Sequence, residues 1–311
     1  MRTKPIALVG YLALAILISL LLLSRGNWLS PQSVAVLGDK AASPKTLIAM
    51  AYTECGEMCI RNLQYFTRVG IHKHDQNDYF IVSNGPCSYC KSDEFKQRLQ
   101  YSNVKLIERE NIGYDFGAYS AAIQAVNVDL YKYFVFFNAG MRGPFVPRNQ
   151  LKDIKDWPNI FTSLLTDKVK LVGTSISCQE HIHVQSFFFA LDLVGLKLLR
   201  EKGVFRLAES DIHELVRCCE LGSTRHMFEA GYTVDSLNHW SGRYNWTKMW
   251  LENRGTNGCN DGINPSAQFW SETVGNWYRD SPTVERHQMS PLLTTFTKIG
   301  GNARLYSFHK C

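Results

Sequence analysis

Three absences in the sequence narrow what this chain can be. Its lysines and arginines are scattered without a contiguous basic block, and its formal charge is only +6 over 311 residues. A nucleic-acid-binding protein is therefore a weak interpretation. The chain has no internal repeat or low-complexity segment. Cys87 and Cys90 have a zinc-ribbon spacing, but the sequence has no second Cys-x-x-Cys pair, which disfavours zinc.

The N-terminal segment has the pattern of a membrane anchor followed by a stem. Residues 6–23 carry no charge, and as a helix they would span roughly 27 Å, close to the thickness of the hydrocarbon layer. Arg2 and Lys4 precede them, which favours a cytoplasmic N-terminus. A cleaved signal peptide is the alternative, although its apolar core is usually only about 7–15 residues. We expect a cytoplasmic tail over 1–5, a transmembrane signal anchor over 6–23, a stem over 24–44 and a luminal domain over 45–311.

This topology predicts a single-pass type II protein of the Golgi or endoplasmic reticulum membrane. Nine cysteines suit an oxidising lumen, where disulfides persist. Cys55 lies close enough to Cys59 to pair locally, and Cys87 to Cys90. Asn245 opens an Asn-Trp-Thr triplet, which is an N-glycosylation acceptor in such a compartment.

After the stem, strand patterns alternate with helix patterns. The expected strands are 45–52, 78–85, 104–108, 131–140, 169–177 and 184–192. The expected helices cover 58–71, 92–101, 115–126, 193–201, 209–219 and 223–230. Such alternation predicts an α/β fold with a mostly parallel central sheet. In an open sheet of this kind the ligand lies beyond the carboxyl ends of the strands.

Polar residues and glycines gather at those expected strand ends, and together they suit a nucleotide that carries a sugar. The candidates for donor binding are Tyr52, Glu54, Asn84, Asn111, Gly113, Asp115, Gly117, Asn138 and Arg142.

The chain contains five short motifs in register: "ENIGYDFGAY", "FVFFNAGMRGPFVP", "WPNIFTSLL", "VKLVGTSISC" and "HVQSFFFALD". Together they resemble the rhamnan-synthesis-F type of glycosyltransferase, especially its membrane-anchored eukaryotic relatives. The resemblance covers most of 45–240. It implies a GT-A-like, Rossmann-type nucleotide-sugar fold that transfers a hexosyl or deoxyhexosyl group. The partners that it implies are a nucleotide-diphosphate sugar donor and a glycan or glycoprotein acceptor.

The first of these motifs would place a ligand against a helix start. Its glycines would let the backbone approach the ligand, and the free N–H groups of the helix would face the pyrophosphate. Asp115 would then bind a sugar or ribose hydroxyl; the alternative is that Asp115 only caps its helix. The last motif implies that His183, Gln185 and Ser186 contact the sugar or the acceptor, against an alternative of ordinary polarity at a sheet edge.

The resemblance leaves the metal in doubt. Many GT-A enzymes have an Asp-x-Asp that binds Mn²⁺ or Mg²⁺, but this sequence has Asn138, Ala139 and Gly140 at the corresponding place. A neutral amide is a poor ligand for a hard cation by itself. Arg142 could supply positive charge instead, or could be an exposed turn residue.

Glu220 is the expected catalytic base of an inverting transfer. It precedes a helix pattern that resembles the Glu-Asp…Arg…Ala-Gly-Tyr pattern of many GT-A transferases, with Cys219 in place of the preceding acid. The alternative is an acid that only favours the start of a helix. A non-catalytic carbohydrate-binding or scaffold protein of the same fold is the second hypothesis, and a redox protein that uses Cys87 and Cys90 is the third. The tryptophans after residue 239 could bind the acceptor or cover the core.

Overall fold

The computed structural model describes the core of the domain that was expected to begin at residue 45. The described residues are 45–73, 75–145, 157–177, 181–205, 211–237, 245–252 and 297–298. They all belong to a compact unit of residues 44–311. Within these ranges no helix is long and apolar enough to cross a membrane. The anchor expected over 6–23 lies outside them, as do Trp240, Trp270 and Trp277.

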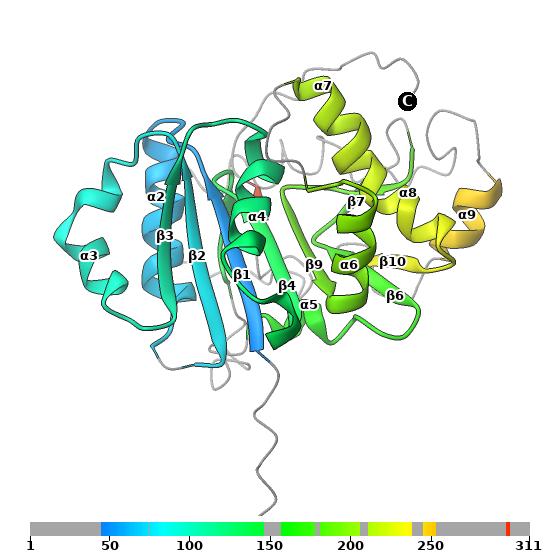
Figure 1. The fold of residues 1–311 in the computed structure, drawn as a ribbon, viewed down its shortest axis with the longest axis horizontal. Helices are drawn as coiled ribbons and strands as arrows, with labels where there is room; N and C mark the ends of the chain where they lie inside the picture. The colour runs from blue at the N-terminus through cyan, green and yellow to red at the C-terminus, as the bar shows by residue number, and fades with distance from the viewer. Residues whose placement is uncertain are drawn as a thin grey trace, which may run out of the picture. The chain divides into compact units, whose positions relative to one another are not determined.

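A seven-stranded sheet with the order β10-β6-β9-β4-β1-β2-β3 forms the centre of this unit (Figure 1). Its strands are β1 (Lys45–Tyr52), β2 (Asn77–Asn84), β3 (Val104–Arg109), β4 (Tyr131–Asn138), β6 (Val169–Gly173), β9 (Phe188–Asp192) and β10 (Thr233–Ser236). Strand β1 pairs in parallel with β2 and β4, β2 with β3, and β10 with β6. Strand β9 alone among these runs antiparallel to its neighbours. The prediction of an α/β fold with a mostly parallel sheet is confirmed.

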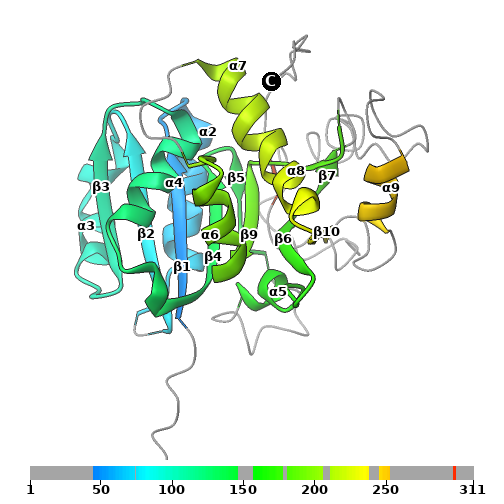
Figure 2. The same ribbon diagram turned by 45° about the vertical axis from the view of Figure 1, so that its right-hand side comes forward.

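Helices cover both faces of the sheet. Helices α4 (Tyr114–Gln124), α6 (Leu193–Glu201) and α8 (Leu221–Glu229) pack on one face, and Figure 2 shows α6 beside α8. Helices α2 (Glu57–Tyr65), α3 (Asp93–Leu99) and α5 (Asn159–Thr162) lie on the other. Strand β1 supplies both layers, since Leu47 and Ala49 join the first core and Ile48 and Met50 the second. An apolar run that is buried on both sides is what a central parallel strand requires.

Local chemistry explains several element boundaries. Ser92 accepts a hydrogen bond from the Phe95 N–H and so caps α3. Asp211 caps α7 (Ile212–Leu215) in the same way, by accepting from His213 N–H. Two short antiparallel pairs lie outside the main sheet. They are β5 (Met141–Arg142) with β11 (Thr297–Lys298), and β7 (Ile176–Ser177) with β8 (His183–Val184).

Three predictions of secondary structure need correction. The single strands expected over 169–177 and 184–192 are each divided, because the chain leaves the main sheet to form the β7–β8 pair. Gly173 permits this fold-back, since a Cβ there would collide with the Val184 side chain. The helices expected over 209–219 and 223–230 are one continuous helical run. A π-helical turn at Val216–Glu220 joins its two parts, and β10 follows it without having been predicted.

Candidate functional site

Two cavities lie at the edge of the sheet where the parallel strands end, and Asp115 lines both. The larger has a volume of about 340 Å³ and is lined by Ala51, Thr53, Cys55, Met58, Cys59, Asp115, Asn138, Ala139 and Gly140. The smaller has a volume of about 130 Å³ and is lined by Tyr114, Asp115, Phe116, Ser186, Ile212, Leu215, Val216 and Glu220. We call them the larger cavity and the smaller cavity. Of the predicted site residues, Asp115, Asn138, Ser186 and Glu220 reach them.

Asp115 owes its position to an unusual start of α4. Gly113 is the N-cap, with a left-handed φ of 75°, and Tyr114 follows with a φ of 46°. Asp115 therefore lies within the first turn, and the alternative that it caps the helix is wrong. Its Oδ2 accepts a hydrogen bond of 2.8 Å from Asn138 Nδ2. This bond joins the end of β4 to the beginning of α4.

Two side chains of neighbouring strands hold the loop before α4. Asn84 is buried, and its Nδ2 donates to the Tyr114 carbonyl at 3.0 Å. Asn84 Oδ1 accepts from Arg109 Nη1 at 2.6 Å, and Arg109 Nη2 donates to the Ile112 carbonyl. Partial burial lowers the pKa of the Arg109 guanidinium. Asn84 was predicted to contact the donor, but its described contacts make it a positioning residue. Arg109 was not predicted.

The glycines of the motif serve the chain itself. A Cβ at Gly117 would collide with the Ile112 carbonyl oxygen and crowd the Arg109 guanidinium. The chain itself therefore requires a glycine at 117, and the approach of a ligand to Gly117 stays a prediction. Gly113 supplies the left-handed φ at the N-cap. Asn111 is exposed, and neither cavity includes it among its lining residues.

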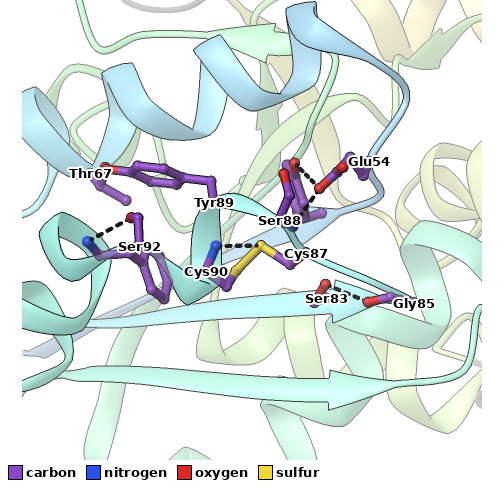
Figure 3. The surroundings of a disulfide bond; sticks show 11 residues. Glu54, Thr67, Ser83, Gly85, Cys87, Ser88, Tyr89, Cys90 and Ser92 are labelled. Carbon is purple, nitrogen blue, oxygen red and sulfur yellow. Dashed lines mark hydrogen bonds between the residues drawn. A yellow bond between two sulfur atoms is a disulfide. The ribbon is translucent and has the colours of Figure 1, made fainter.

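Tyr52 and Glu54 do not line the larger cavity, but they lie next to residues that do. Tyr52 is fully buried, whereas its neighbours Ala51 and Thr53 line the cavity. Burial, then the charge of Glu54, raises the pKa of the Tyr52 hydroxyl, which lies 3.5 Å from Glu54 Oε2. Glu54 Oε2 accepts from the Ser88 N–H at 2.6 Å, as Figure 3 shows, and this backbone bond is the largest cause of its lowered pKa. The two residues thus connect the loops that follow β1 and β2.

Both local cysteine pairs predicted from the sequence form disulfides. Cys55–Cys59 lies in the wall of the larger cavity, beside Met58. Cys87–Cys90 closes the loop after β2, where the Cys90 N–H donates to Cys87 Sγ at 3.1 Å (Figure 3). Over the described ranges, no group of three or more His, Cys, Asp or Glu side chains is placed to hold a metal.

The larger cavity does not fit Mn²⁺ or Mg²⁺. Asp115 is the one carboxylate that the described part of the chain contributes to its lining. Asn138 turns its Nδ2 toward that carboxylate, and its Oδ1 accepts from the Gly140 N–H at 3.1 Å. Hard cations take several oxygen ligands. Among the described lining residues, side-chain oxygens come only from Thr53, Asp115 and Asn138. This donor set is too small, and Asn138 presents an N–H to the carboxylate.

Arg142 is not among the lining residues of either cavity. It belongs to β5, and its guanidinium lies over the Tyr65 ring at 5.6 Å from the centroid. Burial raises the pKa of Tyr65 to about 12. Arg142 is half-buried in a strand, so the alternative of an exposed turn residue is wrong. Its predicted place beside the donor receives no support from this geometry.

Glu220 reaches the smaller cavity from the last residue of the π-helical turn. Its Oε1 accepts from the Ser186 N–H at 3.1 Å. One turn further, Thr224 Oγ1 accepts from the Val184 N–H at 2.9 Å. Side chains of the helical run thus accept hydrogen bonds from the N–H groups of Val184 and Ser186, two residues apart in the segment that enters β9. Because the helical run continues through Glu220, the alternative of an acid at a helix start is wrong.

Ser186 is the one of three predicted sugar-contacting residues that lines a cavity. His183 is buried, and its Nδ1 lies 2.8 Å from the His181 carbonyl oxygen. Gln185 Oε1 accepts from Ser175 Oγ at 2.6 Å. These two side chains stabilise the β7–β8 pair and the segment after it. His183 is buried and Gln185 is half-buried, and neither is among the lining residues of the two cavities.

Tyr119 lies one helical turn after Asp115 and is completely buried. Its hydroxyl has no hydrogen-bond partner among the described residues. Burial, then the charges of Asp115 and Glu220, raises the pKa of Tyr119 well above its ordinary value. The phenol therefore stays protonated beneath the two carboxylates.

The tryptophans that can be placed belong to the core. Trp246 is buried, and Trp250 stacks on Phe228 with ring centroids 5.2 Å apart. Asn245 precedes helix α9 (Trp246–Glu252), and its Oδ1 accepts from the Lys248 N–H at 2.9 Å. Asn245 is exposed, as a glycosylation acceptor must be.

Comparison with known proteins gives one family. The family described as "Rhamnan synthesis protein F" matches residues 79–239, which is more than half of the 311 residues. Two proteins named "Virulence protein VirA", both from Vibrio anguillarum, are each 30% identical over 128 residues. That match covers 39% of this chain and 36% of each relative, so the chain spans about a third of their length.

Solved structures show weaker likeness. A mannosyltransferase from Pyrobaculum calidifontis in complex with GDP-Man and Mn²⁺ is 13% identical, with a TM-score of 0.43; the match covers 62% of this chain and 54% of that one. TarS residues 1–349 from S. aureus is 8% identical, with a TM-score of 0.36; the match covers 60% of this chain and 55% of that one. Likeness at this level assigns no function to a residue.

Proposed function

This chain belongs to the rhamnan synthesis protein F family, and on that premise we propose that it is a glycosyltransferase. It moves a hexosyl or deoxyhexosyl group from a nucleotide-diphosphate sugar to a glycan or glycoprotein. One observation carries this proposal. Asp115 lines two adjoining cavities, with Asn138 beside it in the larger and Glu220 in the smaller. A transfer reaction needs such a meeting point of two ligands.

The larger cavity takes the donor. Its volume of about 340 Å³ lies within the range of small-molecule sites. Asp115 and Asn138 bind hydroxyl groups of the sugar or the ribose. The diphosphate faces the N–H groups at the start of α4, where the helix dipole favours an anion. No step is assigned to a metal, because the donor set does not fit one.

The smaller cavity takes the acceptor, and Glu220 is its base. The Ser186 N–H fixes Oε1 of Glu220, and the carboxylate accepts the proton of the attacking hydroxyl. A bond forms from the acceptor oxygen to the anomeric carbon while the bond from that carbon to the diphosphate breaks. The nucleoside diphosphate leaves with the electron pair. Attack from the side opposite the diphosphate makes the transfer an inverting one.

The test begins with donor binding by the full-length chain in detergent. A panel of nucleotide sugars is screened for thermal stabilisation, with and without Mn²⁺. A donor at 100 times its dissociation constant should add about 2.7 kcal/mol to the free energy of unfolding. Hydrolysis of the best donor is then measured for Glu220→Gln, which should lower the rate by about 10²–10⁴-fold, as loss of a general base does. Glu229→Gln, an exposed acid at the end of the same helical run, is the control and should be unaffected.

The second hypothesis is a non-catalytic carbohydrate-binding protein on the same fold. The larger cavity favours it in one respect, since it lacks the carboxylates that usually hold a metal. Glycan binding without any turnover of a stabilising nucleotide sugar would establish this alternative. Turnover that Glu220→Gln leaves unchanged would reject Glu220 as the base.

We also propose that the domain lies in the lumen of the Golgi or endoplasmic reticulum, behind the anchor expected over 6–23. Two disulfides and an exposed Asn245 support an oxidising, glycosylating compartment. The test is the electrophoretic mobility of the secretory-pathway protein. A glycosidase should increase the mobility of the wild-type chain but not that of Asn245→Gln, and an unchanged wild-type mobility would count against this placement.

A further inference from the structure

We propose that Tyr114 and Ile212 form an apolar platform that binds one pyranose ring of the acceptor in the smaller cavity. The proposal rests on the proposed function, which it deepens by naming a residue that determines acceptor binding. Neither side chain was among the expected site residues. Three features carry the proposal: the exposure of these side chains, the backbone of Tyr114, and the size and chemistry of the cavity.

Exposed apolar side chains gather at this cavity. The large hydrophobic residues exposed among those described are Ile112, Tyr114, Leu130, Val194, Ile212 and Leu251. Tyr114 and Ile212 are 37% and 39% exposed, and both line the smaller cavity. They come from the start of α4 and the start of α7, which are about a hundred residues apart in the sequence. The fold therefore brings two exposed apolar groups to one opening.

The backbone holds Tyr114 in a conformation that its type disfavours. Its φ of 46° is the one positive value found for a non-glycine residue in the described part of the chain. A bulky residue in this region is uncommon, and such outliers concentrate at binding and active sites. The buried Asn84 bonds to the Tyr114 carbonyl, and Arg109 bonds to the Ile112 carbonyl. Two polar side chains thus fix the loop that presents an exposed aromatic ring.

The cavity has room for part of one sugar ring and has the two-sided chemistry of such a ring. Its volume of about 130 Å³ is below the roughly 150 Å³ of an apolar cavity that holds one benzene ring, so it takes one face of a pyranose and does not enclose the whole ring. Phe116, Leu215 and Val216 add apolar lining to the platform, while Asp115 and Glu220 supply carboxylates. A pyranose has an apolar C–H face, which would contact the apolar lining, and an edge of hydroxyl donors, which would bind the two carboxylates. Glu220 gives the smaller cavity a second carboxylate that the larger cavity does not have, so the smaller cavity is the less favourable place for the diphosphate of a donor.

The experiment measures binding of simple acceptor probes to the full-length chain in detergent. The probes are the methyl glycosides of glucose, galactose, mannose, xylose and N-acetylglucosamine, and the readout is saturation-transfer NMR. At least one probe should bind wild type. Tyr114→Ala should lower its signal at least fivefold, whereas Tyr114→Phe should retain it because the ring remains. Leu130→Ala is the matched control, since Leu130 is exposed but precedes β4 at the opposite end of the strand.

Donor binding separates this inference from the proposed function. The nucleotide sugar that stabilises wild type should stabilise Tyr114→Ala equally, because the change keeps the backbone N–H groups at the start of α4 and removes only a side chain that does not line the larger cavity. Equal donor stabilisation also shows that the variant is folded. A stabilising donor together with no bound glycoside, or with an unchanged glycoside signal in Tyr114→Ala, would overturn the platform and leave the donor site standing. Bound glycosides that depend on Tyr114, without any stabilising nucleotide sugar, would support the platform and reject the transferase.

Discussion

The two cavities are built by different means although they share Asp115. The wall of the larger cavity includes the Cys55–Cys59 disulfide, and Glu54 connects that loop to the one closed by Cys87–Cys90. The wall of the smaller cavity depends on single hydrogen bonds, which Glu220 and Thr224 accept from backbone N–H groups of the segment that enters β9. It also includes a π-helical turn and the strained Tyr114.

The difference indicates which cavity wall is held by covalent crosslinks and which is held by hydrogen bonds that can open. Crosslinks restrict the unfolded chain and the local loop at once. Hydrogen bonds between a helix and an extended segment open separately and locally. We therefore expect the larger cavity to be preformed and the smaller one to adapt to its ligand. Three changes test this contrast, in order of decreasing effect.

Removal of the Cys55–Cys59 crosslink should have the largest effect. The double change Cys55→Ala and Cys59→Ala releases a short loop, which should cost about 2 kcal/mol of unfolding free energy. Donor stabilisation should fall as well, because both cysteines line the larger cavity. The matched change, Cys87→Ala with Cys90→Ala, should cost a similar free energy but leave donor stabilisation nearly intact. Equal loss of donor stabilisation in both would contradict a cavity wall formed by the first disulfide.

Thr224→Val should act on the smaller cavity alone. It removes the acceptor of the buried Val184 N–H, and an unsatisfied buried N–H should cost about 1.5 kcal/mol. Hydrogen exchange should become faster in the peptide that covers 183–188 and stay constant in the peptide that covers 45–60. Thr67→Val is the control: Thr67 is equally buried, but its hydroxyl bonds to Tyr89 on the other face of the sheet. Faster hydrogen exchange at 183–188 in Thr67→Val would contradict the prediction that the effect is specific to the Thr224 hydrogen bond.

Glu54→Gln should have the smallest effect, which should be present near neutral pH and disappear in acid. The folded protein lowers the pKa of Glu54, chiefly through the Ser88 N–H. The stabilisation is therefore complete above the pKa of an unfolded glutamate and is lost as the pH falls through the folded value. The melting temperature of Glu54→Gln should lie slightly below that of wild type near neutral pH and converge with it in acid. Glu57→Gln, in the exposed first turn of α2, should follow the wild-type curve throughout.

The strand ends that form the site could be predicted, but the direction of each side chain could not. Apolar runs located β1 to β4, and the parallel arrangement brought Asp115 and Asn138 together. Tyr52 and Asn84 occupy the same edge and yet point into the protein. The reason is the period of two along a strand, which sends neighbouring residues to opposite faces. One residue before Tyr52, Ala51 lines the larger cavity.

The smaller cavity depends on contacts between segments that are far apart in the sequence, and no local sequence pattern predicts such contacts. Glu220 could be proposed by resemblance, but the π-helical turn that aims it arises within one unbroken helical run. Ile212 was hidden because an apolar residue at a helix start usually faces a core. Arg109 could have been suspected, since it is a basic residue at the end of a strand just before the glycine motif.

The shared wall at Asp115 has a thermodynamic consequence. A side chain that faces two ligands at once links their binding free energies, and such linkage is reciprocal. If a ligand in the larger cavity changes the affinity of the smaller cavity for its ligand by some factor, a ligand in the smaller cavity changes the affinity of the larger cavity by the same factor. Isothermal titrations that add the two ligands in either order must therefore give the same total binding free energy. The size of the common factor measures how strongly a single carboxylate couples the binding of the two substrates.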